Sequence, residues 1–484
     1  MKNIMKRFLF LLGFALTACS GEIRLPGILS DGMVLQRESQ AGLWGKALPG
    51  WKVHITTSWD GRTYHILPGA DSTWTARVRT GRAGGPYTVT IRQGRTKLVL
   101  NDILLGEVWL CSGQSNMQMP VMGYRSQPVE GALETLLDAP AHRQVRLLKR
   151  PRSLEGNPDA TWEHPSLEAV SAFSAIGWHF AARISEALDM PVGIIESDWG
   201  GTRIEAWMPA DTVRKIDPAA KEKSGVNRIG VLYDNMIRPY LNYTLRGFLW
   251  YQGESNKENS YIYADLMAGM VRTWRTAFGG GEQMPFYYVM VAPFEYSNGY
   301  DDSVFGDLAA PLLWEAQTKA LDLIPNSGMA VTTDLGVATF IHPPHKREIG
   351  DRLALLALHG TYGEQGGYED GVTLDWSGPR YKEVTFSGNE ALVTFAVNGT
   401  LCPADPLGDG AIEGFEVAGE DRRFYPAEAR MYKTRPYGFT AQVVVSSPKV
   451  PHPVAVRYGF HNVPACNLTS TLGLPVIPFR TDTW

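Results

Sequence analysis

Ser115 stands in the short segment Gly113-Gln114-Ser115-Asn116-Met117, directly after the apolar run Val108-Trp109-Leu110-Cys111. The apolar run predicts a buried strand, and a serine displayed at the end of such a strand is in the position of a nucleophile. A turn is the alternative, because glycine, serine and asparagine also make turns for reasons of backbone conformation alone. This segment by itself does not decide between the two interpretations.

Three other polar segments follow predicted strands later in the chain. They are Trp199-Gly200-Gly201-Thr202, Gln252-Gly253-Glu254-Ser255-Asn256 and Ile341-His342-Pro343-Pro344. In an open sheet of parallel strands, ligands bind beyond the carboxyl ends of the strands. We therefore expect all four segments to open on the same edge of one sheet and to form a single site.

The four segments contain the groups that acyl transfer requires, which are a nucleophile, a base and hydrogen-bond donors for the developing oxyanion. We predict that Ser115 is the nucleophile and that His342 is the base. The backbone N–H groups of Ser115 and Gly200, and the side-chain amide of Gln252, are the predicted oxyanion donors. Two further polar side chains are expected to support the site from behind: Asn116 and Glu254.

Each of these assignments has a structural alternative. Gly200 and Gly201 also suit a plain loop, and Gln252 also suits a brace of its own loop. His345 competes with His342 for the role of base. We prefer His342, because His345 and the three charged residues that follow it begin a helical pattern typical of a solvated face.

The elements that must position these groups fall into three regions. Residues 22–101 contain short runs of alternating polarity separated by glycine and proline clusters, which predicts a small β-sandwich. Residues 102–365 alternate apolar runs with helical patterns, which predicts a parallel sheet with helices on both faces. Residues 366–484 return to strand patterns and predict a second β-sandwich-like domain. The fold class is therefore α/β, with a β domain on each side of the core.

Composition and charge narrow the range of functions. The chain has 484 residues, enough for about three domains, and a formal net charge of −4. We see no dense basic cluster of the kind that binds nucleic acid. No Cys or His spacing is typical of a zinc site, so we expect neither a metal nor another cofactor. Cys402 and Cys466 are candidates for a disulfide, which the sequence alone leaves open.

The N-terminus predicts a targeting segment. Lys2, Lys6 and Arg7 precede a short apolar run, and Leu16-Thr17-Ala18-Cys19 gives a small-residue cleavage site that ends in cysteine. We interpret residues 1–18 as a bacterial lipoprotein signal peptide and Cys19 as the acylated first residue. A plain secretory signal is the alternative. We expect an exported protein, in the periplasm or on the cell surface, that meets the membrane only through this anchor.

Taken together, the motifs resemble those of the sialate O-acetylesterase family, which belongs to the SGNH-hydrolase superfamily. The matching segments are Ser112–Met117, Trp199–Thr202, Trp250–Asn256 and Ile341-His342-Pro343-x-x-Lys346, with support from Glu205–Met208, Pro285–Tyr287, Glu315–Gln317 and the C-terminal segments Gly473–Pro475 and Pro478–Asp482. The resemblance spans nearly the whole chain after the signal peptide. It implies an SGNH core and hydrolysis of O-acetyl esters on sugars without a metal. By motif, it gives Ser115 and His342 as nucleophile and base, and Gly200 and Gln252 as oxyanion donors.

The chain departs from the pattern of the wider superfamily at one point. The superfamily often has an aspartate two or three residues before the histidine, and this chain has Phe340 and Thr339 there. Loss of the triad aspartate cost about 10⁴ in a serine protease, so we expect another group to orient His342. Asp334 is our first choice. Glu254 and a backbone carbonyl are the alternatives.

The resemblance leads to a specific functional prediction and to alternatives. We predict a serine esterase that deacetylates sugars, with O-acetyl esters of sialic acid favoured. An esterase for acetylated xylan or xyloglucan is the second interpretation, and a non-catalytic, lipid-anchored glycan-binding protein is the third. Five aromatic side chains flank the site segments and are candidates for a sugar-binding surface: Trp199 and Tyr251 first, then Trp207, Phe294 and Tyr296. The oligomeric state is left open.

Overall fold

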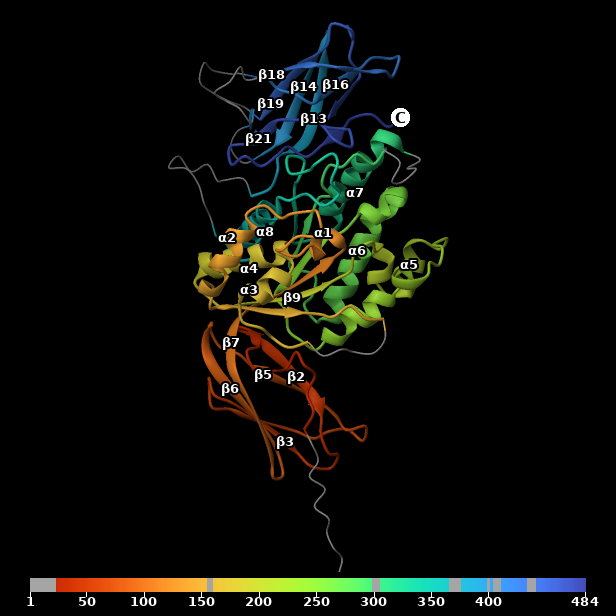
Figure 1. Ribbon diagram of the computed structural model, residues 1–484. Helices are drawn as coiled ribbons and strands as arrows, with labels where there is room; N and C mark the ends of the chain where they lie inside the picture. Colours follow the sequence, from red (N-terminus) through yellow and green to blue (C-terminus); the bar gives the residue numbers. More distant parts are fainter. Residues whose placement is uncertain are drawn as a thin grey trace, which may run out of the picture.

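The computed structural model describes residues 23–154, 160–297, 305–364, 376–397, 401–403, 411–432 and 441–484. An N-terminal β domain, an α/β core and a C-terminal β domain follow one another along the long axis of the molecule (Figure 1). The predicted fold class is confirmed. The predicted signal peptide and Cys19 lie outside the described residues.

The N-terminal domain is a sandwich of two mainly antiparallel layers. Its strands are β1 (Val34–Gln36), β2 (Gln40–Lys46), β3 (Val53–Thr57), β4 (Thr63–Ile66), β5 (Thr73–Arg79), β6 (Gly84–Gln93) and β7 (Thr96–Gly113). One layer pairs β2 with β5, and the other has the order β4-β3-β6-β7. In β5, Trp74, Ala76 and Val78 are buried and the alternate residues are exposed. This period of two is the pattern of a strand with one buried face.

Strand β7 crosses the predicted boundary between residues 101 and 102. Its first half pairs with β6 in the N-terminal domain, from Thr96 to Leu105. Its second half, from Glu107 to Gly113, pairs with two strands of the core. Because one hydrogen-bonded strand belongs to both units, the N-terminal domain is joined to the core by a sheet and not by a loop.

The core sheet is parallel and holds β7 near its centre. The strands that follow β7 along the chain are β8 (Val145–Lys149), β9 (Val192–Asp198), β10 (Gly247–Tyr251), β11 (Phe286–Val289) and β12 (Ser327–Ala330). Their order across the sheet is β8-β9-β7-β10-β11-β12. After β7 the chain builds one side of the sheet and then crosses to the other. The carboxyl end of β7 is therefore a topological switch point, where ligands of open α/β sheets bind.

Helices cover both faces of this sheet (Figure 1). On one face lie α4 (Ala175–Leu188) and α8 (Lys346–Gly360), and on the other lie α6 (Ser260–Ala277) and α7 (Ala309–Leu323). Shorter helices are α1 (Ser115–Gln118), α2 (Ala132–Asp138), α3 (Leu167–Ala172) and α5 (Ala210–Ile216). In α6, Leu266, Met270 and Trp274 are fully buried, as their helical spacing predicts. None of the helices in the described residues is long and apolar enough to span a membrane.

The C-terminal domain is a second antiparallel sandwich. One sheet has the order β13 (Arg380–Ser387), β14 (Glu390–Ala396), β19 (Gln442–Ser446), β18 (Glu428–Met431), and the other has β17 (Phe424–Pro426), β16 (Phe415–Ala418), β20 (Ala455–Tyr458), β22 (Phe479–Arg480). A short pair joins β15 (Leu401–Pro403) to β21 (Leu468–Ser470). Arg480 bonds Glu315 of α7 at 2.9 Å, which fixes this domain to the core. The thiols of Cys402 and Cys466 are separate.

Candidate active site

The turn that carries Ser115 is built by the close approach of two strands. Strand β7 ends at Gly113, and Ser115 is the first residue of α1. Gly113 has φ of 144°, and a Cβ atom there would lie 2.1 Å from the carbonyl oxygen of Tyr251. Only glycine fits this position. The N–H of Gln114 donates to the same carbonyl at 2.9 Å, so β10 holds the turn and Ser115 is displayed at the sheet edge as the sequence predicts.

Gly200 lies directly beside Ser115. A Cβ atom on Gly200 would be 3.2 Å from Cβ of Ser115, and the N–H of Trp199 donates to the carbonyl of Gly113 at 3.0 Å. The N–H of Gly200 donates to Oε1 of Gln118 at 2.7 Å. The N–H of Gly200, which the sequence predicts as an oxyanion donor, is therefore already bonded to the amide oxygen of Gln118. Gln118 lies one residue beyond the segment Gly113–Met117, and no pattern in the sequence marks it as functional.

His342 is oriented by Gln127. Nδ1 of His342 lies 2.7 Å from Oε1 of Gln127. An amide oxygen can only accept a hydrogen bond, so Nδ1 carries the proton and Nε2 keeps its lone pair free for a proton from a nucleophile. This is the tautomer that a general base needs.

Tyr124 connects the turn that contains Gln127 to Ser115. Its hydroxyl donates to the carbonyl oxygen of Ser115 at 2.9 Å, and its ring packs edge-on against the imidazole of His342 with centroids 5.1 Å apart. The backbones of Tyr124 and Gln127 exchange two hydrogen bonds, at 3.0 and 2.9 Å, which close a tight turn. One turn therefore contacts both Ser115 and His342, and we call residues 124–127 the clamp turn.

The environment of His342 keeps its imidazole neutral. Burial, with a smaller contribution from the positive charge of Lys346, lowers the pKa of His342 from its ordinary value to about 4. A histidine with a pKa of about 4 is unprotonated at neutral pH. His342 is therefore in the protonation state in which it can accept a proton.

Asp334 does not have the role that we predict for it. Its carboxylate forms a two-point ion pair with Arg352 of α8, in which Nη1 of Arg352 lies 2.7 Å from Oδ1. The hydrogen bond at Nδ1 of His342 comes instead from Gln127. The prediction fails because Asp334, near the end of the preceding strand, meets an arginine on the neighbouring helix before the chain reaches His342.

Gln252 is likewise not available as an oxyanion donor. Its side chain is fully buried, and both N–H bonds of its amide are used, one to the carbonyl of Thr202 at 3.0 Å and one to Oδ1 of Asn256 at 2.8 Å. Its Oε1 accepts from the hydroxyl of Tyr263 at 2.8 Å. The structure supports the alternative in which Gln252 braces the loops after β9 and β10.

A buried polar network links the serine segment to the histidine segment. Nδ2 of Asn116 donates to Oε1 of Glu254 at 2.6 Å and to the carbonyl of Ile341 at 3.0 Å. Nζ of Lys346 donates to Oδ1 of Asn116 at 2.6 Å. Asn116 and Glu254 thus lie behind the site, as predicted. The neighbour of Ser115 bonds directly to the neighbour of His342, which is why the two segments stay together.

Burial shifts the pKa values of the two ionisable groups in this network, Lys346 and Glu254. Burial lowers the pKa of Lys346 to about 7, although the charge of Glu254 acts in the opposite direction. Burial also raises the pKa of Glu254, against the hydrogen bond from Asn116 and the charge of Lys346. Lys346 is fully buried. In the sequence, Lys346 is marked only as part of the histidine motif, with no predicted role.

The predicted sugar-binding aromatics divide into two groups. Tyr251 and Trp207 are fully buried, so neither can touch a substrate, and the prediction for Tyr251 is wrong. Strand β10 is covered on both faces, and that is what buries Tyr251. Trp199 is partly exposed beside Gly200. Phe340, two residues before His342, is 42% exposed and is an aromatic surface that the sequence analysis did not single out.

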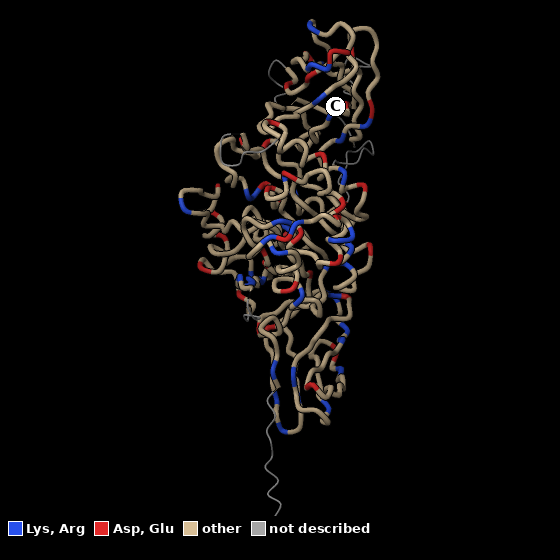
Figure 2. The backbone as a smooth tube through the Cα atoms, turned by 90° about the vertical axis from the view of Figure 1, so that its right-hand side faces the viewer, with Lys and Arg blue, Asp and Glu red and all other residues tan. Residues whose placement is uncertain are grey.

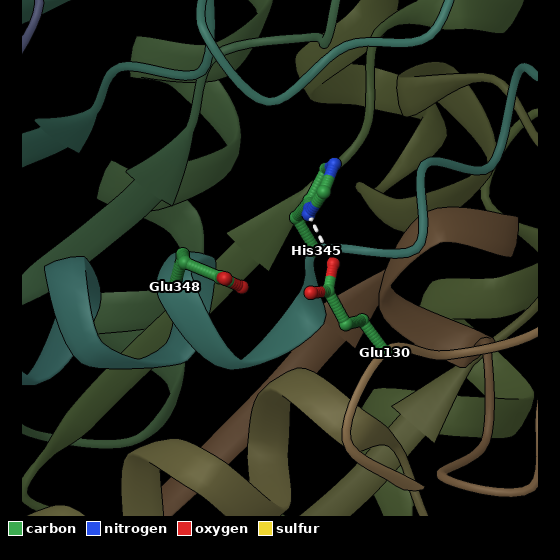
Figure 3. A group of neighbouring side chains, drawn as sticks. All are labelled: Glu130, His345 and Glu348. Atoms are coloured by element: carbon green, nitrogen blue, oxygen red, sulfur yellow. Dashed lines mark ion pairs between the residues drawn. The ribbon is translucent and has the colours of Figure 1, made fainter.

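Among the described residues, one group of side chains has the composition to hold a cation. Glu130, His345 and Glu348 bring their ligand atoms within 4.8 Å of one another. Figure 3 shows Glu130 and His345 facing each other and Glu348 extending from the first turn of α8. Nδ1 of His345 lies 2.8 Å from Oε2 of Glu130, and the N–H of Glu130 donates to the carbonyl of Pro344. These contacts fasten the segment that follows the clamp turn to the loop that carries His342.

Known proteins resemble this chain over most of its length. The family model "Carbohydrate esterase, sialic acid-specific acetylesterase" matches residues 105–358. Sialate O-acetylesterase of Homo sapiens is 30% identical over 413 residues, 76% of each chain, and that of Mus musculus is 29% identical over 439 residues, 76% of this chain and 78% of the other. A crystal structure of a carbohydrate acetylesterase from Xanthomonas citri is 34% identical, has a TM-score of 0.83 and covers 96% of this chain and 100% of its own. The chain belongs to the sialate O-acetylesterase family and is a carboxylic ester hydrolase of the carbohydrate esterase type.

Proposed function

We propose that the protein removes O-acetyl groups from sugars through an acetyl-enzyme intermediate on Ser115, with O-acetyl esters of sialic acid as the favoured substrate. The observation that carries the mechanism is the clamp turn. It hydrogen-bonds the carbonyl of Ser115 through Tyr124 and the Nδ1–H of His342 through Gln127. A neutral histidine of the correct tautomer is thereby held beside the serine segment at the switch point of the sheet.

The proposed reaction has two stages. Oγ of Ser115 attacks the acetyl carbonyl carbon, and Nε2 of His342 takes the hydroxyl proton. The C–O bond to the sugar then breaks, and His342 returns the proton to the departing sugar oxygen. In the second stage His342 takes a proton from water, the resulting hydroxide attacks the acetyl-enzyme, and the proton goes back to Oγ as acetate leaves.

The oxyanion is proposed to receive hydrogen bonds from the N–H groups of Ser115 and Gly200. The second donor becomes available when the carbonyl oxygen of the substrate displaces Oε1 of Gln118, which accepts from Gly200 at 2.7 Å in the free protein. Because one carbonyl oxygen replaces another, the N–H of Gly200 keeps a hydrogen bond throughout, and the number of hydrogen bonds stays constant. Gln118 thereby satisfies the partly buried N–H of Gly200 until the substrate arrives.

The preference for sialic acid rests on the names of the relatives. The mammalian proteins are named sialate O-acetylesterase and match about three quarters of this chain, whereas the Xanthomonas protein is named only as a carbohydrate acetylesterase. We propose in addition that the protein is exported and anchored by a lipid on Cys19. This follows from the charged, apolar and small-residue order of the first 19 residues. Replacement of Cys19 by serine should move the protein from the membrane fraction to the soluble fraction.

The test of the proposed function is acetate release by the form that lacks residues 1–19. The substrates are O-acetylated sialic acid, acetylated xylan and acetylated xyloglucan, and the Ser115→Ala and His342→Ala variants are run alongside. We expect release from O-acetylated sialic acid that both substitutions abolish. Activity that survives Ser115→Ala would overturn the mechanism. Preference for a plant polysaccharide would contradict the proposed substrate and leave the proposed mechanism unchanged.

A further inference from the structure

The N-terminal domain contains a cavity that no step of the proposed reaction uses. Its volume is about 680 Å³, within the range of about 300–1,000 Å³ that is common for small-molecule sites. It is lined by residues of the loop after β1, of the loop between β3 and β4, of the end of β5 with the loop that follows it, and of β6 and β7, where Leu105 is the lining residue. Leu105 lies eight residues before Gly113, which at about 3.3 Å per residue is about 26 Å along the strand. The cavity is therefore remote from Ser115.

Two aromatic rings line the cavity and are held in place. Nε1 of Trp59 donates to the backbone carbonyl of Arg79 at 2.9 Å. The ring of Trp59 packs edge-on against Tyr87 with centroids 5.9 Å apart. Both side chains are partly exposed. Rigid, partly exposed aromatic rings offer a flat apolar surface on which the C–H face of a sugar ring can pack at little cost in conformational entropy.

The same cavity contains positive charges that have no partner. Arg79 and Arg82 line it, and among the described residues their guanidinium groups make no hydrogen bond or ion pair. The acids of the cavity are already engaged. Asp60 accepts from the hydroxyl of Thr57 at 2.6 Å, and Glu38 pairs with Arg37 at 2.9 Å. The charged groups left free to bind a ligand are therefore cationic.

The charge of the whole domain has the same sign. Residues 23–101 contain 11 Lys and Arg against 4 Asp and Glu, a formal charge of +7, whereas the complete chain carries −4. Figure 2 shows Lys and Arg recurring along the strands of this domain, at the lower end of the view. Such an excess attracts anionic ligands over a distance of about one Debye length. Charge and cavity together favour a ligand that has both a sugar ring and an anionic group.

We propose that this cavity is an accessory binding site for a carboxylated saccharide, such as a uronic or nonulosonic acid unit of a glycan. A sugar ring packs on Trp59 and Tyr87, and Arg79 and Arg82 bind the carboxylate, whose two oxygens match the paired N–H groups of a guanidinium. The site binds the glycan and does not cleave it. It is distinct from the esterase centre and does not depend on which ester Ser115 cleaves.

The test compares binding with hydrolysis in the complete mature protein. Binding is measured by calorimetry in the Ser115→Ala background with two matched pairs of probes. One pair is a xylo-oligosaccharide with and without a glucuronic acid branch, and the other is sialyllactose and lactose. The variants are Trp59→Ala and the double variant Arg79→Gln, Arg82→Gln. Hydrolysis of 4-nitrophenyl acetate by the same variants, with Ser115 intact, reports on the remote serine.

The domain offers matched controls outside the cavity. Trp51 is 62% exposed and is not among the lining residues, so Trp51→Ala controls for the loss of an exposed tryptophan. Arg92→Gln and Arg95→Gln remove the same two charges elsewhere. We expect tenfold or greater weakening of the carboxylated probes in both cavity variants. We expect no change in the controls and unchanged hydrolysis of 4-nitrophenyl acetate throughout.

Three results would overturn the proposal. The first is equal affinity for the carboxylated probe and its neutral match, and the second is equal weakening by the cavity variants and the controls. The third is absence of saccharide binding together with binding to vesicles containing 30% phosphatidylglycerol, which would assign the positive domain to a membrane surface. An inactive enzyme that still binds the carboxylated probes would contradict the proposed function and leave the accessory site intact.

Discussion

The hydrogen bond between Gln127 and His342 gives a prediction that can be worked out in some detail. Gln127→Ala removes the acceptor that lies 2.7 Å from Nδ1. A neutral hydrogen bond is worth about 0.5–1.5 kcal/mol net, and each 1.36 kcal/mol in a barrier is tenfold in rate. The lost bond therefore lowers kcat by about two- to tenfold. The upper limit is about 10⁴, the loss found when a protease histidine is held in the wrong tautomer.

Gln127→Glu tests the same contact in the opposite sense. Burial and Lys346 hold the pKa of His342 at about 4 in the wild type, so the imidazole is neutral, and able to act as base, at every pH above that value. A carboxylate at position 127 stabilises the imidazolium and raises this pKa toward the ordinary value of about 6.5. The acid limb of the pH profile of kcat/KM should move upward, and activity at pH 5 should fall relative to activity at pH 8.

Steady-state hydrolysis of a soluble acetyl ester from pH 3.5 to 9 measures both effects. Circular dichroism across the same range separates loss of activity from loss of fold. We expect KM to change little, because Gln127 contacts His342 rather than the position of the sugar. Wild-type kcat in Gln127→Ala, or an acid limb in Gln127→Glu that coincides with that of the wild type, would refute the assignment of Gln127 as the residue that positions His342.

Three other outcomes are expected. Asp334→Asn should leave kcat and its pH profile unchanged and cost at most about 1 kcal/mol of stability, since it removes only a partly exposed pair with Arg352; a large loss of kcat would restore the predicted triad. Gly200→Ala should lower kcat about tenfold or more, because its Cβ would lie 3.2 Å from that of Ser115 and displace an oxyanion donor. Gly81→Ala, whose Cβ meets nothing within 4 Å, is its control. Glu416 and Asp307 raise the pKa of His461 to about 9. The protonated His461 therefore stabilises the folded protein fully below the unfolded pKa of about 6.5, and this contribution is lost as the pH rises through 9. Melting temperatures from pH 6 to 10 should show this loss in the wild type, and a similar loss in His461→Gln would contradict it.

The sequence predicts the parts of the site that depend on strand ends. Ser115, Gly200 and Glu254 each follow an apolar run, and the carboxyl ends of parallel strands must meet at one edge whatever the details of the loops. Gly113 and its neighbours also predict a tight turn, since few residue types tolerate the backbone conformation that such a turn requires. These predictions need only the order of the elements, and the structure has each of the three residues at the expected edge.

The sequence does not predict contacts that depend on where a side chain points after a loop has folded. Gln127 lies 215 residues before His342, in a turn with no strand pattern of its own. Asp334 is closer along the chain, yet Arg352 of α8 takes its carboxylate. Gln252 follows its strand as an oxyanion donor would, but the loop turns its amide inward to Thr202 and Asn256. In each case a neighbour that is distant in sequence decides which group reaches the site.

The carboxylate missing beside His342 is present elsewhere in the site. In a Ser-His-Asp triad the acid contacts the histidine and stabilises the imidazolium that forms during the reaction. Here the histidine has a neutral amide on Nδ1, and the buried acid is Glu254, which contacts Asn116. Lys346, bonded to the other end of that asparagine, carries a charge that disfavours imidazolium, and burial lowers its pKa to about 7. As the pH rises through about 7, Lys346 loses its proton, and the positive charge that disfavours the imidazolium of His342 is removed. The network behind Ser115 thus makes the strength of the base depend on a lysine that never touches the substrate.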